Sequence, residues 1–152
     1  MPDAYLPLAR RLLQQTEPTL RVSAATREAL LAGSSIERHP AGKTLSRRAD
    51  PVHELLLVLD GNLEVSMQGS DGRRSICWYL APGQWMGLIP VIDGRGAIHD
   101  LRSHTESVLL HIPRATFSQA LQADHCLALA CLNLLCERSR SLYDNMAAES
   151  LL

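Results

Sequence analysis

The side chains best suited to chemistry in this sequence are its six histidines, at positions His39, His53, His99, His104, His111 and His125. The segment "HDLRSHTE" places His99 and His104 five residues apart, with Glu106 two residues further on. Histidine and carboxylate groups are the usual ligands of catalytic zinc and related metals. In a regular strand, residues five apart point to opposite faces, so only His104 and Glu106 share a face.

Two ligands do not make a metal site. We therefore expect no metal site and no cofactor, and surface positions for the histidines. A metal-dependent jelly-roll (cupin-like) enzyme that uses His99, His104 and Glu106 is the enzymatic alternative. The sequence contains no G-x-S-x-G nucleophile motif, P-loop or dinucleotide fingerprint. We accordingly expect no enzymatic activity and no catalytic residues.

The four cysteines give little support for redox or metal chemistry. Cys77, Cys126, Cys131 and Cys136 form no C-x-x-C pair. The last three are five residues apart, which turns each by about 140° relative to the one before on a helix. They cannot bind one metal cluster together, and we expect them to be packed as small apolar side chains.

Composition indicates one ordinary globular domain. The chain has 152 residues, a formal net charge of -1 and a sequence pI of about 6.6. Domains that bind nucleic acid normally carry a basic excess, which is missing here. No apolar run approaches the roughly 18 residues of a membrane span. These features predict a cytoplasmic protein that does not contact a membrane and does not bind DNA through this domain.

The elements that would position these side chains fall into three blocks. Helical spacing predicts a helix over 6–13 and a second in "VSAATREALLAG", which Ser23 caps and Gly33 ends in a left-handed turn. In the middle block, Leu63, Val65 and Met67 alternate with polar residues, as in a half-buried strand, and Val108, Leu110 and Ile112 share one face of another. Asp60-Gly61 and Asp71-Gly72 are hairpin signals. Helices return over 113–122 and 123–148, so the chain is mainly β with flanking helices.

The last helix carries a heptad pattern. Positions stepping alternately by four and three are Ala128, Leu132, Leu135, Ser139, Leu142 and Met146. This is the spacing of a two-stranded coiled-coil seam. Leu127, Cys131 and Leu134 make another flank apolar, so the helix needs two partners. We predict that one is its own domain and the other is the same helix of a second chain, with a single buried helix as the alternative.

The order of "PAGKTL", "ELLLVLDGNLEVSM", "LAPGQWMGLIPVIDGRG", a strand, "PRATFSQAL" and a long seam helix resembles the effector domain of the Crp/Fnr superfamily of bacterial transcription regulators. The resemblance implies a double-stranded β-helix (jelly-roll-like) barrel with N-terminal helices over residues 1–122, and a dimerisation helix over 123–152. Family members continue into a winged helix-turn-helix that binds DNA. No such domain follows here, and the ending "ESLL" favours truncation at the dimerisation helix.

The segment "GLIPVIDGRGAIHDLRS" aligns with the phosphate cassette of nucleotide-binding members. There, a glutamate holds the ribose 2′-hydroxyl and an arginine pairs with the cyclic phosphate. The resemblance puts Leu88 at the glutamate, Ala97 at the arginine and Ile98 at the adjacent serine. Losing both charged partners costs roughly 100-fold or more in affinity. Arg95 fills the arginine role only if the Asp-Gly-Arg-Gly turn shifts its register; otherwise it is a solvated turn residue.

Leu142 and Tyr143 align with residues that contact the base in nucleotide-binding members. The effector pocket implied by resemblance consists of Met86, Leu88, Ile89, Arg95, Ala97, Ile98, Leu142 and Tyr143. Leu88, Ala97, Ile98 and Leu142 together indicate an apolar pocket, which favours an effector other than a cyclic nucleotide, of apolar or aromatic chemistry. A pocket filled by its own side chains, in a domain that only dimerises, is the competing interpretation, and cyclic nucleotide binding is the third.

Other sensors of the superfamily use iron–sulfur clusters or haem. The first 76 residues contain no cysteine, which disfavours an N-terminal iron–sulfur cluster. Haem would need an axial ligand such as Cys77, His39, His53 or His111. The sequence thus predicts the sensing and dimerisation domain of a regulator, with an unknown small-molecule effector and with DNA contacts only through a missing C-terminal domain.

Overall fold

The computed structural model describes residues 2–150. Its helices are η1 (Pro2–Tyr5), α1 (Leu6–Gln15), α2 (Ala24–Ala32), α3 (Leu88–Asp93), α4 (Arg114–Ala123) and α5 (His125–Ser150). Its strands are β1 (Ser35–His39), β2 (Thr44–Ser46), β3 (Glu54–Asp60), β4 (Leu63–Gln68), β5 (Arg74–Leu80), β6 (Trp85–Met86), β7 (Asp100–Ser103) and β8 (Ser107–Pro113). β1 and α3 were not anticipated from the sequence.

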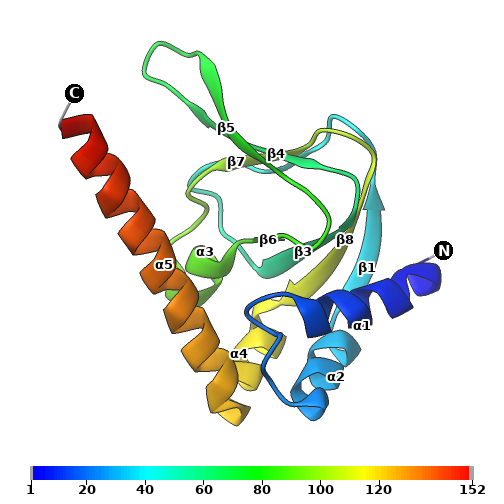
Figure 1. Ribbon diagram of the computed structural model, residues 1–152. Coiled ribbons are helices and arrows are strands. Elements are labelled where there is room, and N and C mark those ends of the chain that lie inside the picture. The colour runs from blue at the N-terminus through cyan, green and yellow to red at the C-terminus, as the bar shows by residue number, and fades with distance from the viewer. Residues whose placement is uncertain (1, 151–152) are drawn as a thin grey trace.

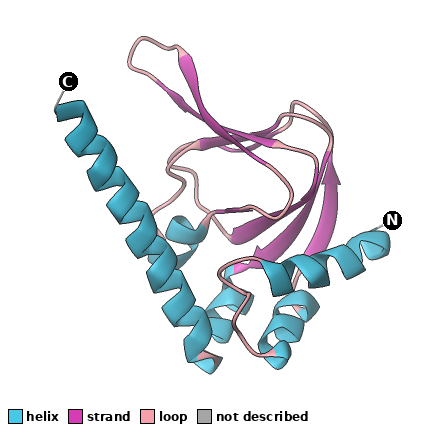
Figure 2. Ribbon diagram, in the orientation of Figure 1, coloured by secondary structure: helices cyan, strands magenta, loops and turns pink. Residues whose placement is uncertain are grey.

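The strands form two antiparallel four-stranded sheets, in the orders β1-β8-β3-β6 and β2-β7-β4-β5. The prediction of a mainly β, jelly-roll-like fold with flanking helices is confirmed, although the two sheets are not joined into a closed barrel. In Figure 1 the β4–β5 hairpin extends away from the body, and α5 runs along one side of the molecule. Figure 2 shows the other helices gathered at one end of the strands.

The sheet β1-β8-β3-β6 is covered on both faces. Leu55, Leu57 and Leu110 belong to a core cluster shared with α1, α2, α4 and α5. Val58 and Leu109 belong to a second cluster, shared with the other sheet. β8 is consequently buried at every position from Ser107 to Ile112. The prediction that Val108, Leu110 and Ile112 share one face is confirmed, since all three belong to the first cluster, and the second sheet covers the opposite face at Leu109.

The second sheet also departs from simple alternation. β4 lies between β7 and β5, and Glu64 and Ser66 are buried along with Leu63 and Val65. Asp71-Gly72 joins the paired strands β4 and β5, as predicted. Asp60-Gly61 does not close a hairpin, because the chain passes there from one sheet to the other.

The helices are fixed at their ends by side chains. Ser23 Oγ accepts a hydrogen bond from the Thr26 amide and caps α2, as predicted. Gly33 ends this helix at a φ of -89°, so the predicted left-handed turn is absent. Asp124 Oδ2 accepts from Thr26 Oγ1 at 2.7 Å and from the Ser23 amide at 3.2 Å. These bonds, the Thr26 bond first, lower the pKa of Asp124 and tie α2 to the start of α5.

Only one cysteine of α5 is packed as expected. Cys131 is buried, and burial raises the pKa of its thiol to about 11, so it is unreactive. Cys126 and Cys136, expected to be packed, are exposed, as is Cys77 on β5. Across residues 2–150, no helix combines the length and apolar character needed to cross a membrane.

Candidate functional site: a cavity between the sheets and the last helix

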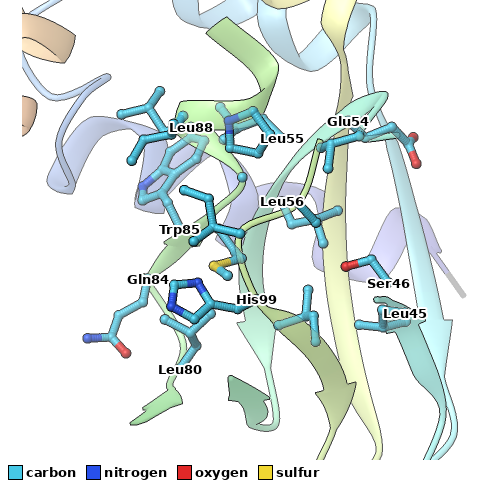
Figure 3. A pocket seen from close by; sticks show the side chains of 18 of the residues that line it. Leu45, Ser46, Glu54, Leu55, Leu56, Leu80, Gln84, Trp85, Leu88 and His99 are labelled. Carbon is cyan, nitrogen blue, oxygen red and sulfur yellow. The ribbon is translucent and has the colours of Figure 1, made fainter. Parts of the chain in front are cut away.

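A cavity of about 1240 Å³ opens between the two sheets, α3 and α5. Figure 3 shows side chains of β2, β3, β5, β6 and α3 around it, including Leu45, Leu56, Leu80, Trp85 and Leu88. Aliphatic and aromatic side chains supply most of the wall between the sheets. A largely apolar cavity with a few polar groups is the usual form of a small-molecule site.

The segment aligned with the phosphate cassette forms one wall of this cavity. Gly87 begins it at a φ of +102°, a left-handed conformation that favours glycine, and α3 follows directly. Further on, the Ala97 amide donates to the Asp50 carbonyl at 2.9 Å, and the Ala49 amide donates to the Ala97 carbonyl at 2.8 Å. The exit of the cassette is therefore fixed by backbone pairing rather than by side chains.

Six of the eight predicted pocket residues line the cavity: Met86, Leu88, Ile89, Ala97, Ile98 and Leu142. Leu88 is only 3% exposed and packs in the core cluster as well. Arg95 and Tyr143 are not among the lining residues. Arg95 is exposed in a turn, where its amide donates to Asp93 Oδ1, and Tyr143 is 69% exposed on α5.

Two tryptophans that the sequence reasoning overlooked also line the cavity. Trp85 is anchored by a 3.0 Å hydrogen bond from its Nε1 to Thr16 Oγ1. Trp78 lies edge-on to His99, with ring centroids 4.9 Å apart. Burial and then the charge of Arg48 lower the pKa of His99, which favours its neutral ring. These rings give the cavity flat apolar surfaces beside a neutral hydrogen-bonding group.

Comparison with known proteins identifies the family. The family model described as "Cyclic nucleotide-binding domain" matches residues 36–124, which is more than half of the chain. The chain belongs to the cyclic nucleotide-binding domain family. This confirms the resemblance to the effector domain of Crp/Fnr regulators that the sequence suggested.

Individual relatives and solved structures are consistent with this family assignment. The CRP-like protein Clp of Xanthomonas oryzae pv. oryzae is 28% identical over 125 residues, covering 80% of this chain and 54% of Clp. The chain thus spans about half the length of the curated relatives it matches. The sensor domain of the transcriptional regulator DNR from Pseudomonas aeruginosa superposes with a TM-score of 0.80 at 20% identity, covering 91% of this chain and 93% of that one. The Thermus thermophilus catabolite activator protein gives 0.79 at 18% identity, covering 91% and 63%.

Within this cyclic nucleotide-binding domain, cationic groups are scarce around the cavity. Among the lining residues, Lys43 and Arg138 are the only lysine and arginine, and neither belongs to the cassette. Leu88 and Ala97, which the resemblance predicts to stand in place of the glutamate and arginine, both line the cavity with uncharged side chains. This wall therefore presents an apolar surface to the cavity.

The last helix of the domain borders the cavity with one face and leaves an apolar face exposed. Leu134, Arg138, Ser141 and Asn145 line the cavity. The large apolar side chains exposed on α5 are Leu129, Leu132, Leu142, Tyr143 and Met146, each between 57% and 69% accessible. Of the remaining predicted seam residues, Ser139 is exposed, Ala128 is half-buried, and Leu135 is half-buried against the domain's own core.

The expectation of surface positions holds for three histidines, His53, His104 and His125, which are exposed. His39 and His111 are 6% and 7% exposed, so the expectation of surface positions was wrong for both. Their Nε2 atoms lie 2.9 Å apart at the edge of the cavity. Burial, followed by the neighbouring His111 and Lys43, lowers the pKa of His39. Glu37 and His39, two residues apart on one strand face, were a sequence signal for this group. The third member, His111, could not be linked to them because it lies far away in the sequence.

The three residues of the alternative metalloenzyme are not brought together. Glu106 forms an ion pair with Arg38. His104 stacks edge-on against Tyr79, and its Nδ1 lies 3.8 Å from Glu64 Oε2. His99 contacts Trp78 instead. No observation favours an active site built from His99, His104 and Glu106.

Proposed function

We propose that this chain is the effector-sensing and dimerisation domain of a Crp/Fnr-type transcription regulator whose effector is not a cyclic nucleotide. One observation carries the proposal. Leu88, Ala97 and Ile98 line the cavity, and they lie in the segment that resembles the phosphate cassette of the family. The cavity of about 1240 Å³ has room for a small molecule. Its size therefore favours effector binding rather than the alternative of a pocket filled by its own side chains. Trp78 and Trp85 favour an apolar or aromatic effector.

The mechanism rests on α5. One face of this helix borders the cavity through Leu134 and Arg138, and the opposite side exposes Leu129 and Leu132. An effector that contacts the inner face shifts the helix and changes how two such helices pack. Coupling of this kind is typically worth about 1–3 kcal/mol. Residues 123–152 would then transmit the signal, and the remainder of the chain would receive it.

The dimer is proposed from the exposed apolar residues of α5. Leu132, Ser139 and Met146 belong to the predicted seam, and Leu129 and Tyr143 extend the apolar surface beside it. A solvent-exposed apolar strip along one helix is typical of a coiled-coil interface. The chain has a formal net charge of -1 and thus no basic excess for DNA, so we assign DNA contact to other parts of such regulators.

Native mass spectrometry of the purified chain tests both halves of the proposal together. We expect the mass of a homodimer, with an additional small molecule retained per chain that is released under denaturing conditions. Retention is expected because the cavity encloses apolar surface that water hydrates poorly. A dimer without any ligand in repeated preparations would support dimerisation alone, and a monomer would contradict the assigned role of α5.

A further inference from the structure

The edge of the cavity holds a group of ligating side chains that the effector proposal does not use. Within the described part of the chain, Glu37, His39 and His111 form the only group of three or more histidine, cysteine or acidic residues able to hold a metal ion. Each offers one ligand atom, and these atoms all lie within 4.8 Å of one another. His39 and His111 are buried, whereas Glu37 is about half-exposed.

Strand pairing explains how this group is assembled. β1 and β8 are antiparallel neighbours, with Ser35 opposite His111 and His39 opposite Ser107. In β1, residues two apart share a face, so Glu37 and His39 point the same way as His111 does from β8. On the next strand, β3, Leu56 is opposite His111, which places Glu54 on this same face. The group therefore stands on three strands of one rigid sheet.

The hydrogen bonds around the two histidines fix which nitrogen faces which partner. Lys43 Nζ lies 3.1 Å from His39 Nδ1, and Glu54 Oε1 lies 3.2 Å from His111 Nδ1. An ammonium group can only donate and a carboxylate can only accept. With both rings neutral, His39 Nδ1 accepts, His111 Nδ1 donates, and the single proton between the two Nε2 atoms is on His39.

The spacing of the three ligand atoms suits a metal ion. The Nε2 atoms are 2.9 Å apart, and Glu37 Oε2 lies 3.3 Å from His111 Nε2. Ligand atoms on a tetrahedral zinc ion, at bond lengths of about 2.0–2.2 Å, lie roughly 3.3 Å from one another. The two observed separations lie within about 0.4 Å of this spacing, and all three ligand atoms lie within 4.8 Å of one another. A metal-bound histidine normally donates its other ring nitrogen to a carboxylate, as His111 already does to Glu54.

We propose that Glu37, His39 and His111 bind a divalent transition-metal ion of the zinc class, with Glu54 as the residue that positions His111. Two imidazoles and one carboxylate are a ligand set suited to zinc rather than to calcium or magnesium. On binding, His39 gives up the proton on Nε2 and takes one up on Nδ1, so the ring stays neutral. Lys43 then turns away with its ammonium group intact, which its exposed position permits. The remaining coordination position faces the cavity.

Lys43 makes the proposal sharply testable, because its charge opposes the metal and its hydrogen bond holds His39 in the wrong tautomer. Replacing it with a neutral side chain, Lys43→Met, should tighten zinc binding by about tenfold. His39→Gln and His111→Gln should each weaken binding by about 100-fold, and Glu54→Gln by about tenfold. His104→Gln is the matched control, since it removes an exposed histidine outside the group and should leave zinc affinity unchanged.

The experiment is calorimetric titration with zinc chloride of the chain carrying Cys77→Ser, Cys126→Ser and Cys136→Ser. These substitutions remove the exposed thiols, which would bind zinc on their own. We expect one zinc ion per chain at micromolar affinity or tighter, and the changes described for each variant. Absence of stoichiometric binding in this background, or a Lys43→Met variant that binds no more tightly, would overturn the proposal. The Lys43 variant alters an exposed side chain, so it tests the site even if a variant of a buried histidine fails to fold. The proposed effector does not enter this test.

Discussion

Leu132→Glu is expected to convert a dimer of this domain into monomers. Leu132 is 57% exposed on α5 and lies in the predicted seam, where a two-fold axis would bring it close to its counterpart in the second chain. The substitution removes apolar contact from both helices and places two like charges near each other in the interface. Losing such a central contact typically costs about 2 kcal/mol or more per chain. Sedimentation velocity should show the monomer mass at concentrations where the unsubstituted chain is dimeric.

Position 132 tests the seam better than Leu135, its neighbour in the heptad pattern. Leu135 is half-buried against the domain's own core, so a charge there would also disturb folding. Asn133→Glu is the matched control, because it adds the same charge at the next, exposed position of the helix. The control should remain dimeric. Unchanged sedimentation of Leu132→Glu would show that α5 does not form the interface in this way.

Leu88→Glu is expected to lower the free energy of unfolding by about 3–5 kcal/mol, the range for an uncompensated charge in a protein interior. The substitution restores the residue type that nucleotide-binding relatives carry at the aligned position. In this chain, however, Leu88 is 3% exposed and packs with the helices as well as lining the cavity. Within the cavity lining, no arginine of the cassette is present to compensate a carboxylate. Urea denaturation followed by circular dichroism measures the loss.

The pH dependence separates the buried charge from a simple packing defect. Burial raises the pKa of the introduced carboxyl group above its ordinary value of about 4.3. The native state then binds more protons than the unfolded state, so the variant regains stability as the pH falls towards about 5. Leu88→Met, which keeps the position apolar, should cost only about 1 kcal/mol at either pH. A Leu88→Glu variant as stable as the parent would show that the position is solvated, as a nucleotide-binding site requires.

Local patterns predicted much of the fold because they depend on neighbouring residues. The helical spacing over 6–13 and the long apolar pattern after Asp124 correspond to α1 and α5. Asp71-Gly72 correctly marked a hairpin. Asp60-Gly61 carries the same signal, but there the chain changes sheets, and no local feature distinguishes the two turns.

What could not be predicted depends on contacts between distant segments. His39 and His111 meet only because β1 pairs with β8, and β1 itself was overlooked. Glu64 and Ser66 are polar and were expected to face solvent, yet the central position of β4 buries both. The segment after Gly87 could be picked out as a cavity wall from the sequence because its residues are contiguous. Trp78 and Trp85 were missed because they reach the same cavity from other strands.

We propose that the segment after Gly87 does not recognise a cyclic nucleotide. Calorimetric titration of the purified chain with cyclic AMP, and separately with cyclic GMP, tests it most directly. With Leu88 and Ala97 in place of two charged partners, affinity should fall by about 100-fold or more relative to a charged cassette. We predict no heat of binding beyond dilution for either nucleotide at micromolar concentrations. Saturable binding of either nucleotide with micromolar affinity would contradict the account.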